Sequence, residues 1–218
     1  MNSKISTKTL AILAMLAALS YVVMFWSRSL PPLVPMPPLK YDPKDIFIIL
    51  GGFLYGPFVT IAMSAVVSLI EMVTVSTTQF YGLLMNIVST CAFAFPATAI
   101  YKKFRSIKGA VTGLGIGLVL MVIVMMLWNY IITPLYMRVP REAVAAMLIP
   151  VFLPFNLLKG SLNAALTMMI YKPLSDALRK MGMLPKSEKG KANLGIIVAS
   201  VFAAATCILL MLVFAGVI

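Results

Sequence analysis

A single lysine stands in the middle of a long apolar segment of the chain. Lys159 lies between the stretches 147–158 and 161–171, too far from either end to be a simple topology signal. Asn156 precedes it by three residues and Asn163 follows it by four, so in a helix the three side chains share one face. An unpaired ammonium or amide in hydrocarbon is costly. We therefore expect this polar stripe to face a cavity or a partner.

The sequence offers this lysine no obvious carboxylate. All the acidic residues are predicted to lie near helix ends or in loops, and they are Asp42, Asp45, Glu71, Glu142, Asp176 and Glu188. Asn129 and Asn86 place further amide groups in two other apolar segments. We predict that a ligand supplies the missing hydrogen-bond acceptors, although such amides also join helices to each other within membranes.

The residue types on the stripe limit the chemistry of this ligand. Amides and one ammonium, framed by Leu, Met, Phe and Tyr, suit a neutral molecule that is flat and apolar on its faces. Its edges should carry carbonyl, imide and hydroxyl groups. A strongly anionic ligand would require more than one cation.

Composition indicates that helices in a membrane position these residues. The chain has 218 residues, of which 61% are hydrophobic and 11% charged, and its mean hydropathy is +1.02. Soluble domains are roughly half apolar and about a quarter charged. We predict an all-α integral membrane protein, with helices near residues 7–26, 44–55, 57–75, 80–101, 109–133, 143–172 and 193–217. The second of these is too short for a comfortable span.

The net charge of +12 is explained by topology rather than by nucleic acid. With a cytoplasmic N-terminus and seven crossings, 12 of the 18 basic residues fall in inside connections, as the positive-inside rule requires. The C-terminus is then external, and the stripe of Asn156 and Lys159 lies in the outer half of its helix and opens outward. The predicted location is the cell membrane.

Enzymatic chemistry is disfavoured by the residue types in the apolar segments. The chain has no histidine, and its two cysteines, Cys91 and Cys207, show no metal-binding spacing. Glu71 is interpreted as a lone interfacial acid near a helix end. No Walker A motif is found, and we predict no cofactor and no metal site.

The connection 27–43 contains six of the 14 prolines and is therefore not helical. Its apolar residues suggest that it packs onto the site as an external lid, the alternative being a structural connector. Small residues also recur at helix-packing spacing, as Ala14-x-x-x-Ala18 in the first helix and as Gly109, Gly113 and Gly117 in the fifth. Both stripes are compatible with packing inside the bundle or with docking of another membrane subunit.

Several motifs together resemble the riboflavin-specific S components of energy-coupling factor (ECF) transporters. They cover about residues 7–180 and read, in chain order, Ala14-x-x-x-Ala18, Leu39-Lys40-Tyr41-Asp42-Pro43-Lys44-Asp45, Gly51-Gly52-Phe53-Leu54-Tyr55-Gly56-Pro57, Gly82-x-x-Met85-Asn86, Asn129-Tyr130 and Asn156-Leu-Leu-Lys159-Gly160. The resemblance implies that Asn129, Asn156 and Lys159 contact a flavin. The predicted substrate-binding set is completed by Leu39, Lys40, Tyr41, Met85 and Asn86.

The resemblance also implies a division of labour between subunits. This chain would capture riboflavin outside and dock through Ala14 and Ala18 on a transmembrane coupling protein (T component) carried by two cytoplasmic ATP-binding cassette ATPases. ATP hydrolysed by those partners would drive delivery inward. The alternatives are an S component for another small ligand, such as FMN or another vitamin, and an intramembrane enzyme.

Two features depart from the family pattern. Leu83 stands where many relatives have an acidic residue, and the apolar run 192–218 lies beyond the usual six helices. We therefore divide the chain into an S-component membrane domain, 1–185, with the lid at 27–43, and a cytoplasmic linker with an additional transmembrane helix, 186–218.

Overall fold

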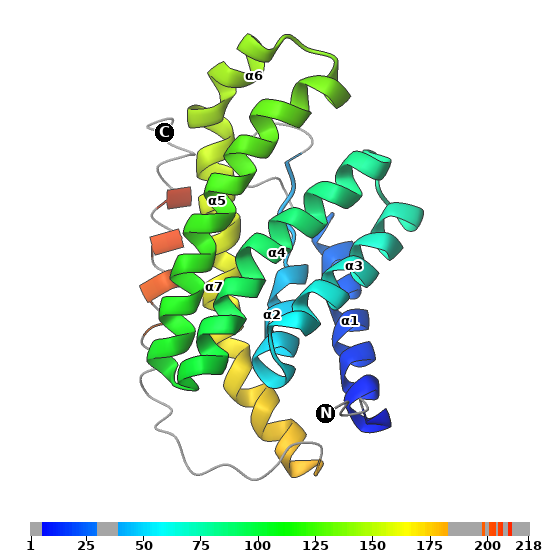
Figure 1. The fold of residues 1–218 in the computed structure, drawn as a ribbon, viewed down its shortest axis with the longest axis vertical. Helices are drawn as coiled ribbons and strands as arrows, with labels where there is room; N and C mark the ends of the chain where they lie inside the picture. Colours follow the sequence, from blue (N-terminus) through cyan, green and yellow to red (C-terminus); the bar gives the residue numbers. More distant parts are fainter. Residues whose placement is uncertain are drawn as a thin grey trace.

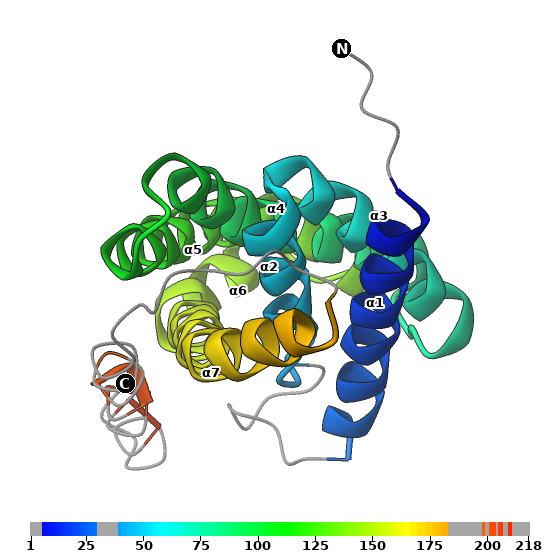
Figure 2. The same ribbon diagram turned by 90° about the horizontal axis from the view of Figure 1, so that it is seen from below.

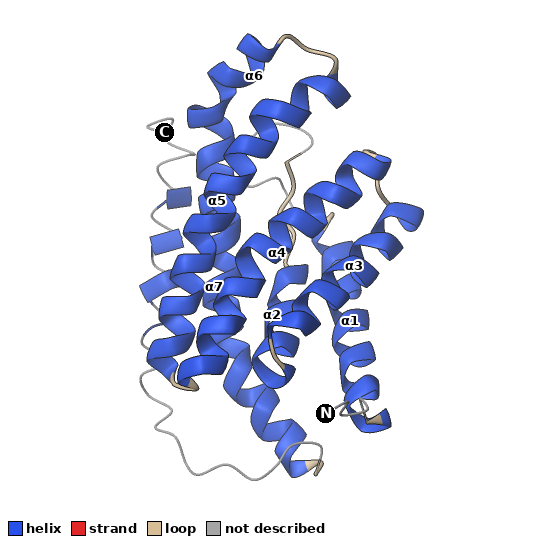
Figure 3. Cartoon of the chain, in the orientation of Figure 1, coloured by secondary structure: helices blue, strands red, loops and turns tan. Residues whose placement is uncertain are grey.

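The computed structural model describes residues 6–29 and 39–182, together with residues 198, 201–203, 205, 206, 209 and 210. The described part of the chain consists of helices and short connections, without strands (Figure 3). The helices are α1 (Thr7–Ser27), α2 (Lys44–Tyr55), α3 (Pro57–Thr74), α4 (Gln79–Phe104), α5 (Ile107–Met137), α6 (Arg141–Met147), the π-helix η1 (Leu148–Phe152) and α7 (Leu153–Lys180). The predicted all-α class is confirmed.

Local sequence signals set several helix ends. The Ser6 side chain accepts a hydrogen bond from the Thr9 amide at 3.1 Å and caps α1, and Ser106 caps α5 in the same way. Gly56 has φ 106°, a conformation open to glycine, and separates α2 from α3, which begins at Pro57. These signals explain why the predicted starts of α1, α3 and α5 lie within two residues of the observed ones.

The short helix α2 occupies the centre of the bundle. Seen along the bundle, α1, α3, α4 and α7 surround it (Figure 2), and it contacts all four. Nine of its 12 residues are buried. At about 18 Å it is too short to span hydrocarbon, but neighbouring helices cover it. It begins near the middle of the bundle and runs downward (Figure 1), which keeps the alternation of chain direction.

Five helical stretches of the described chain are long and apolar enough to cross a membrane. They are α1, α3, α4, α5 and the continuous stretch Arg141–Lys180. The predicted number of seven crossings would need α2 and the C-terminal segment in addition, and α2 is not among the five. The C-terminal helix predicted at 193–217 lies largely outside the described residues, as do residues 30–38 of the predicted lid and the linker from 186.

The prediction of one uninterrupted helix at 143–172 was wrong, both in the form of the helix and in its ends. It begins at Arg141, contains the π-helix η1, and continues as α7 to Lys180. Pro150 and Pro154 lie in and just after η1, and a proline removes a backbone donor, so the hydrogen-bond pattern of an α-helix cannot continue unbroken here. The apolar periodicity of the sequence does not reveal this change of pitch.

One end of the bundle gathers the elements that form the site. The ends of α1, α3 and α5, the starts of α4 and α7, and the connection into α2 all lie in the upper half of Figure 1, which we call the upper end. The start of α1, the α4–α5 connection and the end of α7 lie at the opposite, lower end. The central core between the two contains Ile12, Leu16, Ile48, Ile49 and Phe93.

Candidate ligand-binding site

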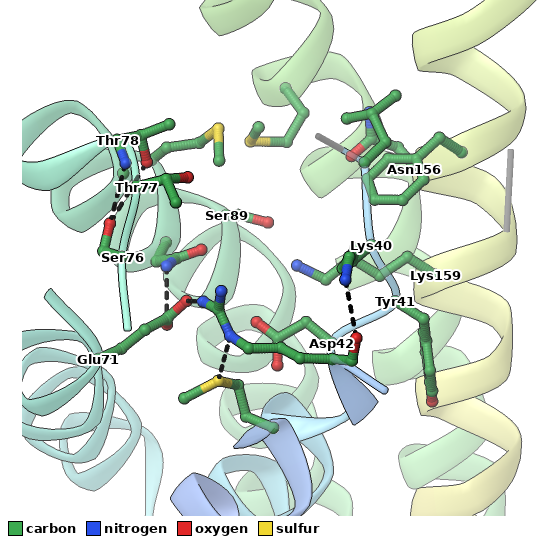
Figure 4. A pocket seen from close by; sticks show the side chains of 18 of the residues that line it. Lys40, Tyr41, Asp42, Glu71, Ser76, Thr77, Thr78, Ser89, Asn156 and Lys159 are labelled. Carbon is green, nitrogen blue, oxygen red and sulfur yellow. Dashed lines mark hydrogen bonds and ion pairs between the residues drawn. The ribbon is translucent and has the colours of Figure 1, made fainter. Parts of the chain in front are cut away.

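A cavity of about 150 Å³ opens in the upper part of the bundle. Residues of α1, α3, α4, α5, η1 and α7 line it, together with the chain just before α2. All eight residues of the predicted substrate-binding set line it: Leu39, Lys40, Tyr41, Met85, Asn86, Asn129, Asn156 and Lys159. In Figure 4, Asn156 and Lys159 project from α7 on one side, and Glu71 and the Ser76–Thr78 turn lie on the other. The structure therefore assembles residues more than 100 positions apart around one space.

The two asparagines of α5 and α7 are each held by their own helix. Asn129 donates to the Met125 carbonyl at 2.7 Å and accepts from Thr133 at 2.9 Å. Asn156 donates to the Phe152 carbonyl, at the end of η1, at 2.7 Å. An amide has two N–H donors and an acceptor oxygen, so each side chain keeps hydrogen-bonding capacity. We call the part of the cavity surface formed by Asn129 and Asn156 the amide wall. These hydrogen bonds fix the orientation of its side chains before any ligand binds.

Lys159 has a carboxylate neighbour that the sequence did not reveal. Its Nζ lies 3.9 Å from Oδ2 of Asp45, which is completely buried. The expectation that no carboxylate lies near Lys159 was wrong, because α2 begins inside the bundle and places its first acidic residue beside α7. Asp45 accepts a closer hydrogen bond from Thr90, at 2.6 Å. Among the described residues Lys159 Nζ makes no hydrogen bond, so its three donors remain available.

The sequence interpretation of Glu71 was also wrong. It is not a lone interfacial acid: it is 6% exposed and accepts three hydrogen bonds at the end of α3. Lys44 lies 2.6 Å away and Arg28 2.9 Å away, and the Asn86 amide donates at 2.8 Å. Glu71 is the only charged residue of α3, and the depth of the last turn of this helix depends on how α1 and α2 pack against it. Only the fold reveals this cluster.

A second set of contacts ties the chain before α2 to α7. The Tyr41 hydroxyl donates to Asn163 at 2.7 Å, and Asn163 donates to the Asp42 carbonyl at 3.1 Å. Burial raises the pKa of Tyr41, which keeps the hydroxyl protonated as a donor. Asn163, on the polar face of α7, is completely buried, so it joins protein segments rather than lining the cavity.

The charge on Asp42 is fixed by its neighbours. Burial alone would raise the pKa of Asp42, but the ammonium groups of Lys44 and Lys159 hold the pKa of this carboxyl below its usual range. Lys44 lies 2.6 Å from its Oδ2. At the rim, Lys40 is exposed and donates to the Arg28 carbonyl at 2.7 Å. This hydrogen bond joins the end of α1 to the segment that leads into α2.

The two small-residue stripes have different surroundings. Gly113 and Gly117 face α4: a Cβ at Gly113 would lie 2.6 Å from the Ala97 carbonyl oxygen, and one at Gly117 would meet the Phe93 carbonyl. These glycines therefore permit close packing of α4 and α5. Ala14 and Ala18 are exposed on α1, where no other described helix covers them. They lie away from the cavity, on a surface available to lipid or to a partner.

Comparison with known proteins identifies the family of this chain. The model of the family "ECF transporter, substrate-specific component" matches residues 8–171. The chain belongs to this family. As an S component of an ECF transporter it is a transport subunit and not an enzyme. Several of its helices are long and apolar enough to cross a membrane. The family resemblance of the sequence motifs is confirmed.

Individual proteins align along most of the chain. The riboflavin transporter RibU of Staphylococcus aureus (strain TCH60) is 30% identical over 180 residues, which cover 80% of this chain and 94% of the relative. The riboflavin transporter FmnP of Bacillus subtilis (strain 168) is 28% identical over 162 residues, covering 70% and 84%. A solved structure described as the S component of a bacterial ECF transporter superposes with a TM-score of 0.67 at 30% identity, covering 78% of this chain and 97% of that one.

The cavity of this S component contains residues that sequence reasoning did not select. They are Met24, Ser27, Arg28, Asp42, Glu71, Ser76, Thr77, Thr78, Gly82, Ser89, Met125, Tyr136, Phe152 and Phe155. Glu71 had a detectable signal, since an acid in the last turn of an apolar helix is costly unless paired. The hydroxyl residues 76–78 had none, because a polar turn is ordinary in any loop.

Proposed function

We propose that this S component binds riboflavin in the cavity described above. The observation that carries the proposal is the convergence of the amide wall, Lys159 and the chain before α2 on one cavity. Two relatives that the chain matches over 94% and 84% of their lengths are named riboflavin transporters, which supports this choice of ligand. The ligand is transported and is not a cofactor.

The chemistry of riboflavin fits the two sides of the cavity. Its tricyclic ring is flat and neutral, with carbonyl and imide groups along one edge, which complement the free donors and acceptors of Asn129, Asn156 and Lys159. Met85 and Leu39 offer apolar contact to the ring faces. The polyol chain of the vitamin would then point toward the hydroxyl groups of residues 76–78 on the opposite wall.

The proposal is tested by titrating the purified chain in detergent with riboflavin, FMN and thiamine. Quenching of flavin fluorescence reports the first two, and competition against riboflavin reports thiamine. We expect saturable quenching by riboflavin at one site per chain and no competition by thiamine. Saturation by thiamine alone would indicate an S component for another vitamin, and binding of no ligand would refute the proposal.

We further propose that the upper end faces the outside of the cell and that the N-terminus is cytoplasmic. The basic residues Lys102, Lys103, Arg105 and Lys108 lie at the lower end, and this placement supports the orientation by the positive-inside rule. Riboflavin would enter from outside. A transmembrane coupling protein with two ATP-binding cassette ATPases would drive its release, and the exposed Ala14 and Ala18 would form the docking surface.

A further inference from the structure

The carboxylate of Glu71 neutralises a cation that lines the cavity. Its Oε1 accepts from Arg28 Nη2 at 2.9 Å, and its Oε2 accepts from Lys44 and Asn86. The Arg28 side chain is 33% exposed and that of Glu71 is 8% exposed. Arg28 thus combines a partly accessible guanidinium with a buried partner, and both residues line the cavity.

The buried and partly buried charges around the cavity balance. Three cations stand against three carboxylates in two groups: Arg28 and Lys44 pair with Glu71 and Asp42 at 2.6 to 2.9 Å, and Lys159 lies 3.9 Å from Asp45. Lys44 and Asp45 lie behind the residues that line the cavity. The exposed rim residue Lys40 is the one further charged residue that lines the cavity. Solvent screens an exposed charge more than a buried one. The interior of the site therefore presents little net charge to a ligand.

We infer that Glu71 is a specificity-determining residue, which favours a neutral flavin over its phosphate ester by occupying the guanidinium of Arg28. The inference rests on the proposed flavin site. A phosphate monoester carries about −1.5 to −2 charges at neutral pH, and a free guanidinium on a cavity wall would bind it by paired hydrogen bonds. Glu71 already takes that place, and its own negative charge repels the phosphate.

Removing either partner should change the preference in opposite directions. Glu71→Gln keeps the shape of the side chain but frees Arg28 and leaves the site with one positive charge in excess. Arg28→Met removes the guanidinium and leaves one negative charge in excess. The interaction of a unit charge with a phosphate a few ångströms away is large enough in a partly buried site to change an affinity ratio by about tenfold or more.

The experiment measures the dissociation constants of riboflavin and FMN by fluorescence quenching with the purified full chain. We expect the riboflavin-to-FMN preference to fall at least about tenfold in Glu71→Gln and to rise in Arg28→Met. It should return close to the wild-type value in the double variant. The shift in Glu71→Gln should shrink at high salt, because it is electrostatic.

Glu142→Gln is the matched control. It makes the same change in net charge, but Glu142 is exposed on α6 and does not line the cavity. An unchanged preference in both Glu71→Gln and Arg28→Met, or an equal shift in Glu142→Gln, would overturn the inference. If Glu71→Gln does not fold, the partly exposed Arg28 still provides the test, and an unchanged or lowered preference in Arg28→Met overturns it. Failure of the wild-type chain to bind either flavin would instead refute the proposed function.

Discussion

Lys159 allows the sharpest test of how the site works. We expect Lys159→Leu to weaken riboflavin binding strongly, because among the described side chains of α7 the Lys159 ammonium is the only charged group that lines the cavity. Its Nζ makes no hydrogen bond to the described residues and has its carboxylate neighbour, Asp45, 3.9 Å away. A ligand carbonyl can therefore take a hydrogen bond from it without breaking one within the protein.

The size of the effect follows from the type of bond that is lost. A hydrogen bond to a charged group contributes about 1.5–3 kcal/mol, which corresponds to an affinity that is roughly 10- to 150-fold weaker. The same substitution also leaves Asp45 buried without its cation. Breaking a buried ion pair in this way costs about 3–5 kcal/mol, and this is an upper bound here because Thr90 and Asn163 also donate to Asp45.

A second substitution separates binding from stability. Asp45→Asn removes the uncompensated charge, so Lys159→Leu with Asp45→Asn should recover stability but not affinity. Riboflavin binding is measured by fluorescence quenching, and stability by size-exclusion chromatography after heating. Lys103→Leu, at an exposed position of the lower end, is the control for loss of one positive charge. If the double variant binds riboflavin within about threefold of Asp45→Asn alone, the assigned role of Lys159 is wrong.

Three further predictions concern the surroundings of the site. Replacing Ala14 and Ala18 with Trp should leave riboflavin binding intact and stop cellular uptake, and uptake at the wild-type rate would contradict the docking role. Gly117→Val should destabilise the fold by about 1–3 kcal/mol, because a Cβ there meets the α4 backbone. Gly115→Val should have little effect, because nothing lies within 4 Å of a Cβ at that position. Equal melting temperatures of the two variants would argue against this packing. Tyr41→Phe removes the hydrogen bond that Asn163 accepts, which should cost about 1–2 kcal/mol of stability. Riboflavin should then dissociate several-fold faster in stopped-flow traces, and an unchanged rate would contradict this role of Tyr41.

The sequence was informative where a residue type contradicts its surroundings. Lys159 and Asn156 in an apolar segment signalled a cavity by their cost alone, and the helical period placed them on one face. The structure puts both on the wall of that cavity. The family motifs added residues 39–41. An apolar, a basic and an aromatic residue have no unusual cost in a loop, so the residue types alone would not have selected them.

The sequence was misleading where depth in the membrane was judged from position along the chain. Asp45, Lys44 and Glu71 lie at predicted helix ends, where charged residues usually meet water or lipid headgroups. In the fold all three are buried, because α2 is short and enclosed by its neighbours. The sequence likewise left the glycine and alanine stripes equivalent, and only the contact between α4 and α5 separates them.

The sequence by itself determined that this chain is a helical membrane protein with a polar face on one of its long helices, since hydrophobicity and helical period are local properties. The tertiary structure alone decided which charges meet. Asp45 reaches Lys159 and Glu71 reaches Arg28 across more than 40 positions, and such pairs depend on how whole helices pack. The ion pairs that balance the cavity are therefore a property of the fold, although each charge in them is visible in the sequence.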